Sequence, residues 1–331
     1  CPFCCPRSRS EKYRPGANRS PIGGPPSAGD TDVTQLGGTV ARAKANGIEI
    51  EYETTGDRNN PALLLVMGLG AQLTIWPDKL FTGLADRGFH VIRYDNRDTG
   101  LSTDFSAWGQ ANVPAAIQKA MKGEKVDAPY TLNDMAADAI GLLDAIGVER
   151  AHIVGGSMGG MIVQLMAIEH PHRVLSLTSI MSNSGEPEYG QPTPEAMEAL
   201  VATPPSNRDD YIASADNWMV WQSKKHRNPE QNRIDAAASY DRSFYPEGAP
   251  RQLAAIYASG RRTDGLKNLT VPTLVIHGTD DTLIAPSGGI RAAELIPKAR
   301  LELVEDMGHD LPRPLWPTIT GAIVSHISSI N

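Results

Sequence analysis

Short apolar runs alternate with helix-like segments along most of the chain. Runs such as 63–67 are continuous, which is typical of strands buried on both faces of a sheet. Because strands that alternate with helices are joined by right-handed crossovers, this order predicts an α/β domain with a mostly parallel sheet. We expect strands at 63–67, 91–94, 151–154, 174–181, 273–276 and 301–304, and helices at 76–87, 131–146 and 158–170.

Two local signals mark where elements begin. The pair Asn46-Gly47 separates the runs 39–44 and 48–54 and predicts a hairpin. Thr131, followed three residues later by Asp134, has the spacing of a capping box and predicts the start of a helix. We therefore expect the regular fold to begin at residue 39.

The alternation breaks over 183–268, where no convincing buried strand is found. This stretch is too long for a structureless loop, and it holds eight of the chain's 19 aromatic residues. It predicts a helical cap over the carboxyl edge of the sheet, inserted into a core formed by 39–182 and 269–331. We expect its aromatics mainly to form the cap's own core, with one or two reaching an apolar substrate pocket. The expected cap helices are 194–201, 208–221, 228–240 and 250–259.

Residues 1–38 have a different composition from the rest. They contain six Pro and six Gly and no apolar periodicity, which predicts a disordered basic tail. All three cysteines, Cys1, Cys4 and Cys5, lie in this tail, so we expect neither a disulfide framework nor a four-cysteine zinc site to hold the fold. The apolar segment of a secretory signal is not recognisable after the basic residues. We therefore expect a cytoplasmic protein.

Composition narrows the classes of function. Of 331 residues, 40% are hydrophobic and 21% are charged, which is typical of a globular protein. The longest nearly apolar run, 61–71, falls well short of the ~20 residues that a membrane helix needs, so we expect no membrane span. The net charge of −7 argues against a nucleic-acid partner. These numbers do not indicate an oligomeric state.

The pattern G-x-S-x-G occurs at 155–159. It follows the expected strand 151–154 and opens the expected helix 158–170, which is the setting of a nucleophile elbow. So tight a turn forces a strained backbone on Ser157, and side chains at positions 155 and 159 would collide. Ser157 is therefore the candidate nucleophile.

A serine hydroxyl is a weak nucleophile and needs a base. His309 follows the expected strand 301–304, and the carboxyl ends of parallel strands are where reactive groups gather. Asp281 lies in the loop after the expected strand 273–276, and we choose it as the acid that orients the imidazole. Its neighbour Asp280 is expected to be solvated or to cap the next helix.

Developing negative charge on an acyl oxygen needs positioned donors. One expected donor is the backbone N–H of Met158, the residue after the nucleophile, and the other is the backbone N–H of Leu69 in the loop after 63–67. The glycines around Leu69 also suggest a dinucleotide-binding turn, but Leu73 occupies the place of the third glycine of that motif. An oxidoreductase is therefore disfavoured.

With these motifs in place, the chain over about 40–330 resembles a capped α/β-hydrolase with a serine nucleophile. It most resembles the esterase branch that includes aclacinomycin methylesterase-like proteins. The resemblance implies the α/β-hydrolase fold, a triad of Ser157, Asp281 and His309, and the two backbone donors named above. The residues that carry it are Val66-Met67-Gly68, Arg93-Tyr94-Asp95-Asn96-Arg97-Asp98-Thr99-Gly100-Leu101-Ser102, the Ser157 elbow, 273–286 and Met307-Gly308-His309.

The chain departs from many relatives at two positions and in one segment. Met67 stands where many have His; because the oxyanion donors are backbone groups, the hole is expected to survive. Asp98 stands where many have Gly, and we expect it to pair with a neighbouring arginine. The segment 105–130 is longer than in many relatives and is expected to edge the pocket.

These observations predict a carboxylic ester hydrolase that acts on a small-molecule ester and needs neither a metal nor an organic cofactor. The same triad on a lactone, thioester, amide or carbon–carbon bond, or in peracid formation, is the nearest alternative, because the fold alone does not separate these reactions. A non-catalytic binding protein on this scaffold is a further alternative, but no triad member is missing. Dehalogenase and epoxide hydrolase chemistry is disfavoured because both use an aspartate where this chain has Ser157.

Overall fold

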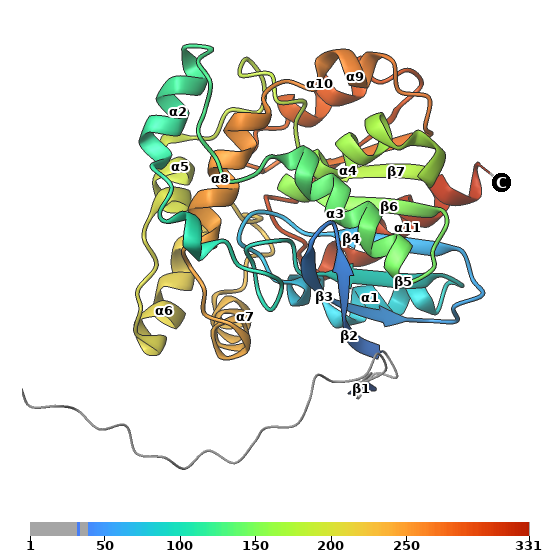
Figure 1. Cartoon of the computed structure of the whole chain (residues 1–331), viewed down its shortest axis with the longest axis horizontal. Coiled ribbons are helices and arrows are strands. Elements are labelled where there is room, and N and C mark those ends of the chain that lie inside the picture. The colour runs from blue at the N-terminus through green and yellow to red at the C-terminus, as the bar shows by residue number, and fades with distance from the viewer. Residues whose placement is uncertain (1–31, 34–38, 331) are drawn as a thin grey trace, which may run out of the picture. The chain divides into compact units, whose positions relative to one another are not determined.

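The computed structural model describes residues 32–33 and 39–330 of the chain. Its strands are β1 (Asp32–Val33), β2 (Thr39–Ala45), β3 (Ile48–Thr55), β4 (Ala62–Val66), β5 (His90–Tyr94), β6 (Ala151–Gly156), β7 (Val174–Ile180), β8 (Thr273–Gly278) and β9 (Arg300–Val304). Within the described residues they form one sheet of nine strands in the order β1-β2-β3-β5-β4-β6-β7-β8-β9 (Figure 1). Neighbours from β5 to β9 run parallel, whereas β1, β2, β3 and β5 pair antiparallel. The predicted, mostly parallel sheet is confirmed.

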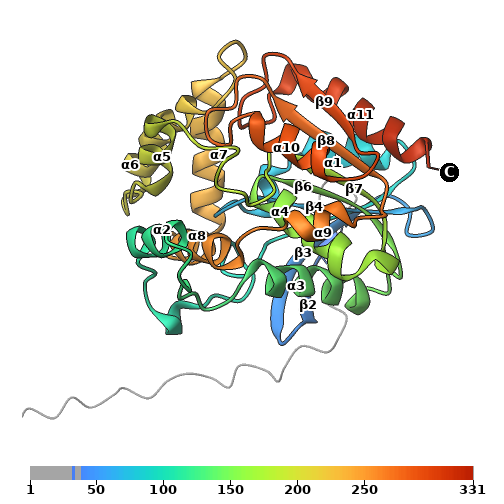
Figure 2. The same cartoon turned by 90° about the horizontal axis from the view of Figure 1, so that it is seen from above.

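Helices cover both faces of this sheet (Figure 2). They are α1 (Asp78–Ala85), α2 (Val113–Met121), α3 (Leu132–Ala145), α4 (Met158–Glu169), α5 (Pro194–Val201), α6 (Arg208–Ser214), α7 (Pro229–Arg242), α8 (Gly248–Ser259), α9 (Thr263–Lys267), α10 (Ser287–Leu295) and α11 (Trp316–Ser328). On β6, Ile153 packs into the apolar cluster that includes α3 and α4, and the next residue, Val154, into the cluster that includes α1 and α11. Successive strand residues point to opposite faces, so both faces are buried, as the continuous apolar runs predict.

The two local signals act as predicted. Asn46 and Gly47 have φ values of 47° and 81° and join β2 to β3 in an antiparallel hairpin, which is the geometry that Asn-Gly turns favour. Thr131 and Asp134 form a capping box at the start of α3, each side chain accepting a bond from the other residue's backbone N–H. Both signals depend only on residues close in sequence, which is why the sequence reveals them.

Five helices, α5 to α9, follow one another between β7 and β8, and the described residues there contain no strand. The prediction of a helical segment is confirmed, although 208–221 divides into α6 and a 3₁₀ helix, Ala215–Val220. The single-turn helix α9 was not expected because five residues are too few for a periodic pattern. α2 precedes this segment in the chain but packs against α8 (Figure 1).

The predicted tail 1–38 lies outside the described residues apart from 32–33. Those two residues form β1, which pairs with the edge of β2; two residues are too few to show a strand pattern in the sequence. Cys1, Cys4 and Cys5 also lie outside the described part. Within that part, no helix has the length and hydrophobicity needed to cross a membrane.

Candidate active site

Ser157 stands on a strained turn between β6 and α4. Its φ is 56° and its ψ is −122°, a combination that residues other than glycine rarely adopt. A Cβ added at Gly155 would lie 2.2 Å from the Gly159 carbonyl oxygen, and one added at Gly159 would lie 2.1 Å from the Val66 carbonyl oxygen. Both positions therefore need glycine, as the G-x-S-x-G pattern predicts. The turn leaves Ser157 at the carboxyl edge of the sheet.

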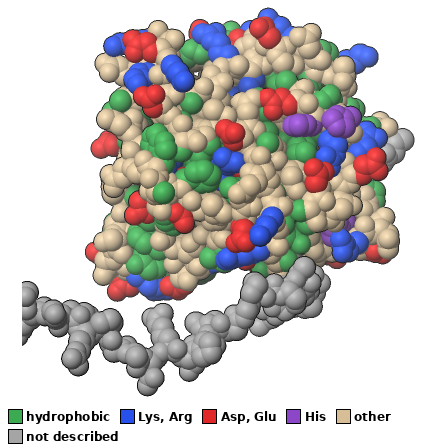
Figure 3. Space-filling view, in the orientation of Figure 1, with side chains coloured by type: hydrophobic (Ala, Val, Ile, Leu, Met, Phe, Trp, Pro, Cys, Tyr) green, Lys and Arg blue, Asp and Glu red, His purple; other side chains and the backbone are tan. Residues whose placement is uncertain are grey.

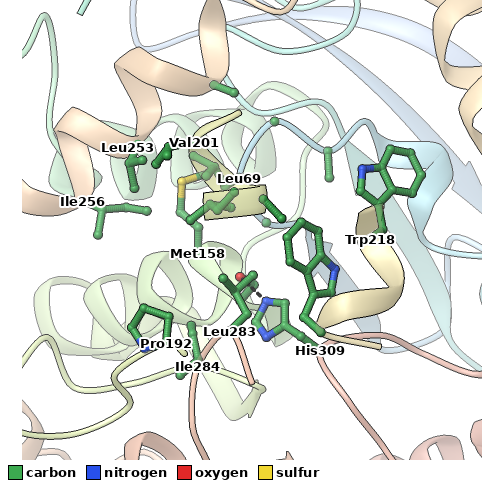
Figure 4. A pocket seen from close by; sticks show the side chains of 18 of the residues that line it. Leu69, Met158, Pro192, Val201, Trp218, Leu253, Ile256, Leu283, Ile284 and His309 are labelled. Carbon is green, nitrogen blue, oxygen red and sulfur yellow. Dashed lines mark hydrogen bonds between the residues drawn. The ribbon is translucent and has the colours of Figure 1, made fainter. Parts of the chain in front are cut away.

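The loops after β8 and β9 bring the other two candidates to Ser157; Figure 4 shows His309 at the cavity. His309 Nε2 lies 2.9 Å from Ser157 Oγ, and His309 Nδ1 lies 2.8 Å from Asp281 Oδ2. A proton on Nδ1 satisfies the carboxylate and leaves Nε2 to accept from the serine hydroxyl. Asp280 stays outside this hydrogen-bonded chain, and its Oδ2 accepts from the backbone N–H of Lys224 at 3.3 Å.

Asp281 is a buried carboxylate with several partners. Its Oδ1 accepts from the backbone N–H groups of Leu283 and Ile284, at 2.9 and 2.8 Å. His277 is a further neighbour of this carboxylate, with its Nε2 3.3 Å from Asp281 Oδ2. Burial raises the pKa of Asp281, but the imidazoles of His309 and His277 outweigh burial and hold the pKa at about 2. The carboxylate is therefore ionised at neutral pH, and its position is fixed by groups other than His309.

Part of the helical segment between β7 and β8 contacts the histidine loop. The backbone N–H of His309 donates to the carbonyl of Trp221 at 2.7 Å. Asp310 Oδ1 accepts from the backbone N–H groups of Ser223 and Gly308, at 3.1 and 3.2 Å, and burial raises the pKa of Asp310 to about 6. Sequence reasoning identified neither Asp310 nor Trp221; for Asp310 the available signal was its place next to the candidate base.

The loop after β4 lies directly against Ser157. A Cβ added at Gly68 would lie 2.9 Å from Ser157 Cβ, so this approach needs glycine. Leu69 is the next residue of the loop, and Met158 is the first residue of α4. Neither backbone N–H is paired within the described part of the chain, as expected for Met158 because the first N–H of a helix has no partner inside the helix. The role of these two N–H groups as oxyanion donors stays a prediction.

A cavity of about 2630 Å³ reaches Ser157 and His309. Residues of α2, α5, α7 and α8 line it together with the loops after β4 and β9. Around His309 the lining is mostly apolar (Figure 4). The apolar residues labelled there are Leu69, Met158, Pro192, Val201, Trp218, Leu253, Ile256, Leu283 and Ile284.

The aromatics of the helical segment serve two places. Tyr211, Tyr240 and Phe244 pack on one another with ring centroids 4.5 to 5.5 Å apart, as expected for the segment's own core. Trp218 and Trp221 line the cavity, and Tyr211 and Phe244 also reach its wall. Several aromatics border the cavity because it extends over several of these helices; that one or two of them touch a substrate stays a prediction.

The rim of the cavity is partly apolar. Met121, at the end of α2, is 82% exposed and Val201, at the end of α5, is 45% exposed, and both line the cavity. Figure 3 shows hydrophobic side chains among charged ones on the part of the surface where α2, α5 and α8 lie in Figure 1.

Among the residues that the structure describes, no group of three or more His, Cys, Asp or Glu side chains is placed to hold a metal ion. The polar groups at the site are a hydroxyl, an imidazole and a carboxylate in hydrogen-bonding order. Such a set is suited to nucleophilic attack on a carbonyl carbon.

Residues 61–312 match the family described as alpha/beta hydrolase fold. The chain belongs to this family. The rhodomycin D methylesterase DauP of Streptomyces sp. (strain C5) is 29% identical to this α/β-hydrolase over 301 residues, which cover 83% of this chain and 93% of the relative. The putative carbamate hydrolase RutD of Variovorax paradoxus (strain S110) is 28% identical over 263 residues, which cover 78% and 89%.

A solved structure, that of the enol-lactonase from Burkholderia xenovorans LB400, is also similar to this α/β-hydrolase. Its TM-score is 0.65 at 25% sequence identity, and the match covers 87% of this chain and 100% of that one. The predicted α/β-hydrolase fold and the predicted resemblance to the methylesterase branch are confirmed. Together, the family and these relatives support a hydrolytic function.

Proposed function

We propose that this α/β-hydrolase cleaves carboxylic esters of small molecules through an acyl-enzyme intermediate. The observation that carries the proposal is the hydrogen-bonded chain from Asp281 through His309 to Ser157, with distances of 2.8 and 2.9 Å. The strained turn at Ser157 and the unpaired N–H groups nearby support the same reaction. Similarity to a methylesterase favours an ester as the bond that is cleaved.

Each group then has a chemical role. Ser157 Oγ attacks the ester carbonyl carbon while His309 Nε2 takes the hydroxyl proton. Asp281 is ionised, because its pKa is about 2, and it stabilises the imidazolium and holds the proton on Nδ1. The backbone N–H groups of Leu69 and Met158 donate to the oxyanion. The imidazolium then protonates the leaving alcohol, and the neutral imidazole activates the water that hydrolyses the acyl-enzyme.

In this proposal the segment 183–268 is a cap that shapes the substrate pocket, and α2 extends its wall. The cavity of about 2630 Å³ exceeds the roughly 300–1000 Å³ of common small-molecule pockets. Trp218 and Trp221 present flat apolar surfaces to it. These aromatic surfaces favour aromatic esters, and the volume of the cavity admits bulky ones.

The test is the loss of ester hydrolysis in Ser157→Ala. We expect this variant to fold, to lose turnover of p-nitrophenyl and methyl esters, and to resist labelling by a fluorophosphonate. Ser182→Ala is the control, because the Ser182 hydroxyl is buried and has no hydrogen-bond partner in the described residues; this variant should keep both ester turnover and labelling. Ester hydrolysis at the wild-type rate in Ser157→Ala would overturn the proposal.

The same groups can act on another acyl or carbon–carbon bond. The similarities to a putative carbamate hydrolase and to an enol-lactonase favour carbamates and lactones as the first alternatives. Ratios of kcat/KM across esters, lactones, carbamates, thioesters and amides of matched size decide between them. A value for a lactone or carbamate more than tenfold above the best ester would replace the ester assignment, while Ser157 kept its role.

A further inference from the structure

Gln252, in α8, reaches the loop that carries the Leu69 donor. It is fully buried, and its Oε1 accepts from the backbone N–H of Gly70 at 2.7 Å, although the two residues are 182 positions apart. Its Nε2 donates to the carbonyl of Arg97 at 2.8 Å and to Thr99 Oγ1 at 2.6 Å. A flipped amide would place its NH₂ group against the Gly70 N–H and its oxygen against the Arg97 carbonyl. These partners therefore fix the orientation of the Gln252 amide.

Within residues 67–71 of this loop, two further hydrogen bonds accompany the bond to Gly70. Asn96 Nδ2 donates to the carbonyl of Met67 at 2.8 Å, and the carbonyl of Gly68 accepts from the N–H of Ala71 at 3.3 Å. Gly70 has a φ of 64°, the positive value that the third position of a type II turn needs. The peptide group that carries the Leu69 N–H therefore lies between two peptide groups that buried side-chain amides hold in place.

We propose that Gln252 is a positioning residue for the oxyanion hole: by holding the Gly70 N–H, it aims the Leu69 N–H at the oxygen that becomes charged. The inference rests on the proposed function. α8 also contacts the loop directly, since a Cβ added at Gly70 would lie 3.0 Å from the Ala249 side chain. Through Gln252, a helix that lines the substrate cavity is connected to the catalytic machinery.

The effect should appear in the transition state and not in ground-state binding. An oxyanion-hole donor acts on charge that develops during the reaction, and its loss costs about 10²- to 10³-fold in kcat in comparable sites. A donor that is displaced but still present costs less. We therefore expect Gln252→Met, which keeps the length of the side chain but removes all three hydrogen bonds, to lower kcat roughly 10- to 100-fold with little change in KM.

The experiment compares Gln252→Met and Gln252→Glu with Ser259→Ala. Ser259 is on the same helix and accepts from the backbone N–H of Leu132 at 2.8 Å, so its variant removes a contact of α8 with the core away from the loop. We expect Ser259→Ala to keep wild-type kcat/KM. Gln252→Glu retains an acceptor for the Gly70 N–H and should recover part of the loss. The affinity for a trifluoromethyl ketone, whose oxyanion uses the same donors, should fall in parallel with kcat/KM.

Several outcomes would overturn the proposal. The first is a folded Gln252→Met variant with wild-type kcat/KM. The second is a loss of kcat/KM without a parallel loss of affinity for the ketone, because that result is expected if Gln252 has only a structural role. If Gln252→Met does not fold, Gln252→Asn carries the same test. Its side chain is one methylene shorter, so it keeps a buried amide but draws the oxygen away from the Gly70 N–H; unchanged kcat/KM in Gln252→Asn then overturns the proposal.

Failure of the proposed function gives a different result. In that case the wild-type protein does not turn over esters, or Ser157→Ala turns them over equally well. The hold of Gln252 on the loop is then measured by amide hydrogen exchange at Gly70, which should be faster in Gln252→Met than in Ser259→Ala. Equal exchange in the two variants would show that Gln252 does not hold the loop.

Discussion

A buried ion pair between Asp98 and Arg251 joins the loop after β5 to α8. Arg251 Nε donates to Asp98 Oδ2 at 2.6 Å, with the two side chains 1% and 0% exposed, and Arg251 Nη2 donates to Oδ1 at 2.8 Å. The hydroxyls of Tyr130 and Tyr245 also donate to this carboxylate, at 2.7 and 3.0 Å. Asp98 was expected to pair with a neighbouring arginine, and its partner proves to be 153 positions away.

We predict that Arg251→Met strongly destabilises the fold. The substitution keeps an apolar stem but leaves the Asp98 carboxylate buried without a cation, with only two phenol donors and the backbone N–H of Phe105 as partners. Breaking one side of a buried ion pair costs about 3–5 kcal/mol. That is a large share of the ~5–15 kcal/mol by which domains are stable. Adding Asp98→Asn removes the stranded charge, and asparagine tolerates the φ of 66° at this position. The double variant should therefore regain about 1–3 kcal/mol of the unfolding free energy.

Urea denaturation of the wild type, both single variants and the double variant measures this coupling. Arg208→Met is the matched control, because Arg208 pairs with Asp241 while the side chains are 44% and 55% exposed; its loss should stay within about 1 kcal/mol. Two results would refute the reasoning: losses that simply add in the double variant, or an Arg251→Met loss no larger than that of the control.

Two further predictions concern carboxylates near His309. Asp281→Asn should lower kcat for esters by about 10³- to 10⁴-fold with an unchanged melting temperature, since an amide oxygen can still accept the two backbone N–H groups on Oδ1; kcat within tenfold of wild type would contradict the role of Asp281. Burial raises the pKa of Asp310 to about 6, above the unfolded value of about 3.9. Asp310 therefore contributes to the unfolding free energy in its protonated form, below about pH 4, and this contribution is lost as the pH rises through about 6. Asp310→Asn keeps an acceptor at Oδ1, so it should raise the unfolding free energy by about 1–3 kcal/mol at pH 8 and leave it unchanged at pH 4, as measured by denaturation at both values. An equal gain at both pH values would point to another cause.

The elements that the sequence predicts best depend on neighbours only a few residues apart. The hairpin at Asn46-Gly47 and the capping box at Thr131 are of this kind. The need for glycine at 155 follows in the same way, because a Cβ there would meet the Gly159 carbonyl oxygen of the same turn. At 159 the close neighbour is the Val66 carbonyl oxygen of β4, which only the folded chain brings near. The roles of Ser157 and the other site residues stay predictions, although the structure places the three side chains in one hydrogen-bonded chain.

Contacts between distant segments were not predictable. Neither the pairing of Asp98 with Arg251 nor that of Gln252 with Gly70 has a signal in the sequence, because the partners are 153 and 182 positions apart. The contact of Trp221 with His309 is of the same kind. These partners depend on how the helices between β7 and β8 fold back onto the loops at the carboxyl edge of the sheet.

The sequence by itself determined the order and type of the main elements and the residue types from which a hydrolytic site can be built. It could do so because helix and strand periods, turn preferences and steric crowding in a tight turn act over short distances along the chain. Only the tertiary structure decided that His309 meets both Ser157 and Asp281, and which side chains hold the loop that carries Leu69. A change of a few tenths of an ångström decides whether a hydrogen bond forms. Distances between these side chains are set to that precision by the packing of the whole sheet with its helices.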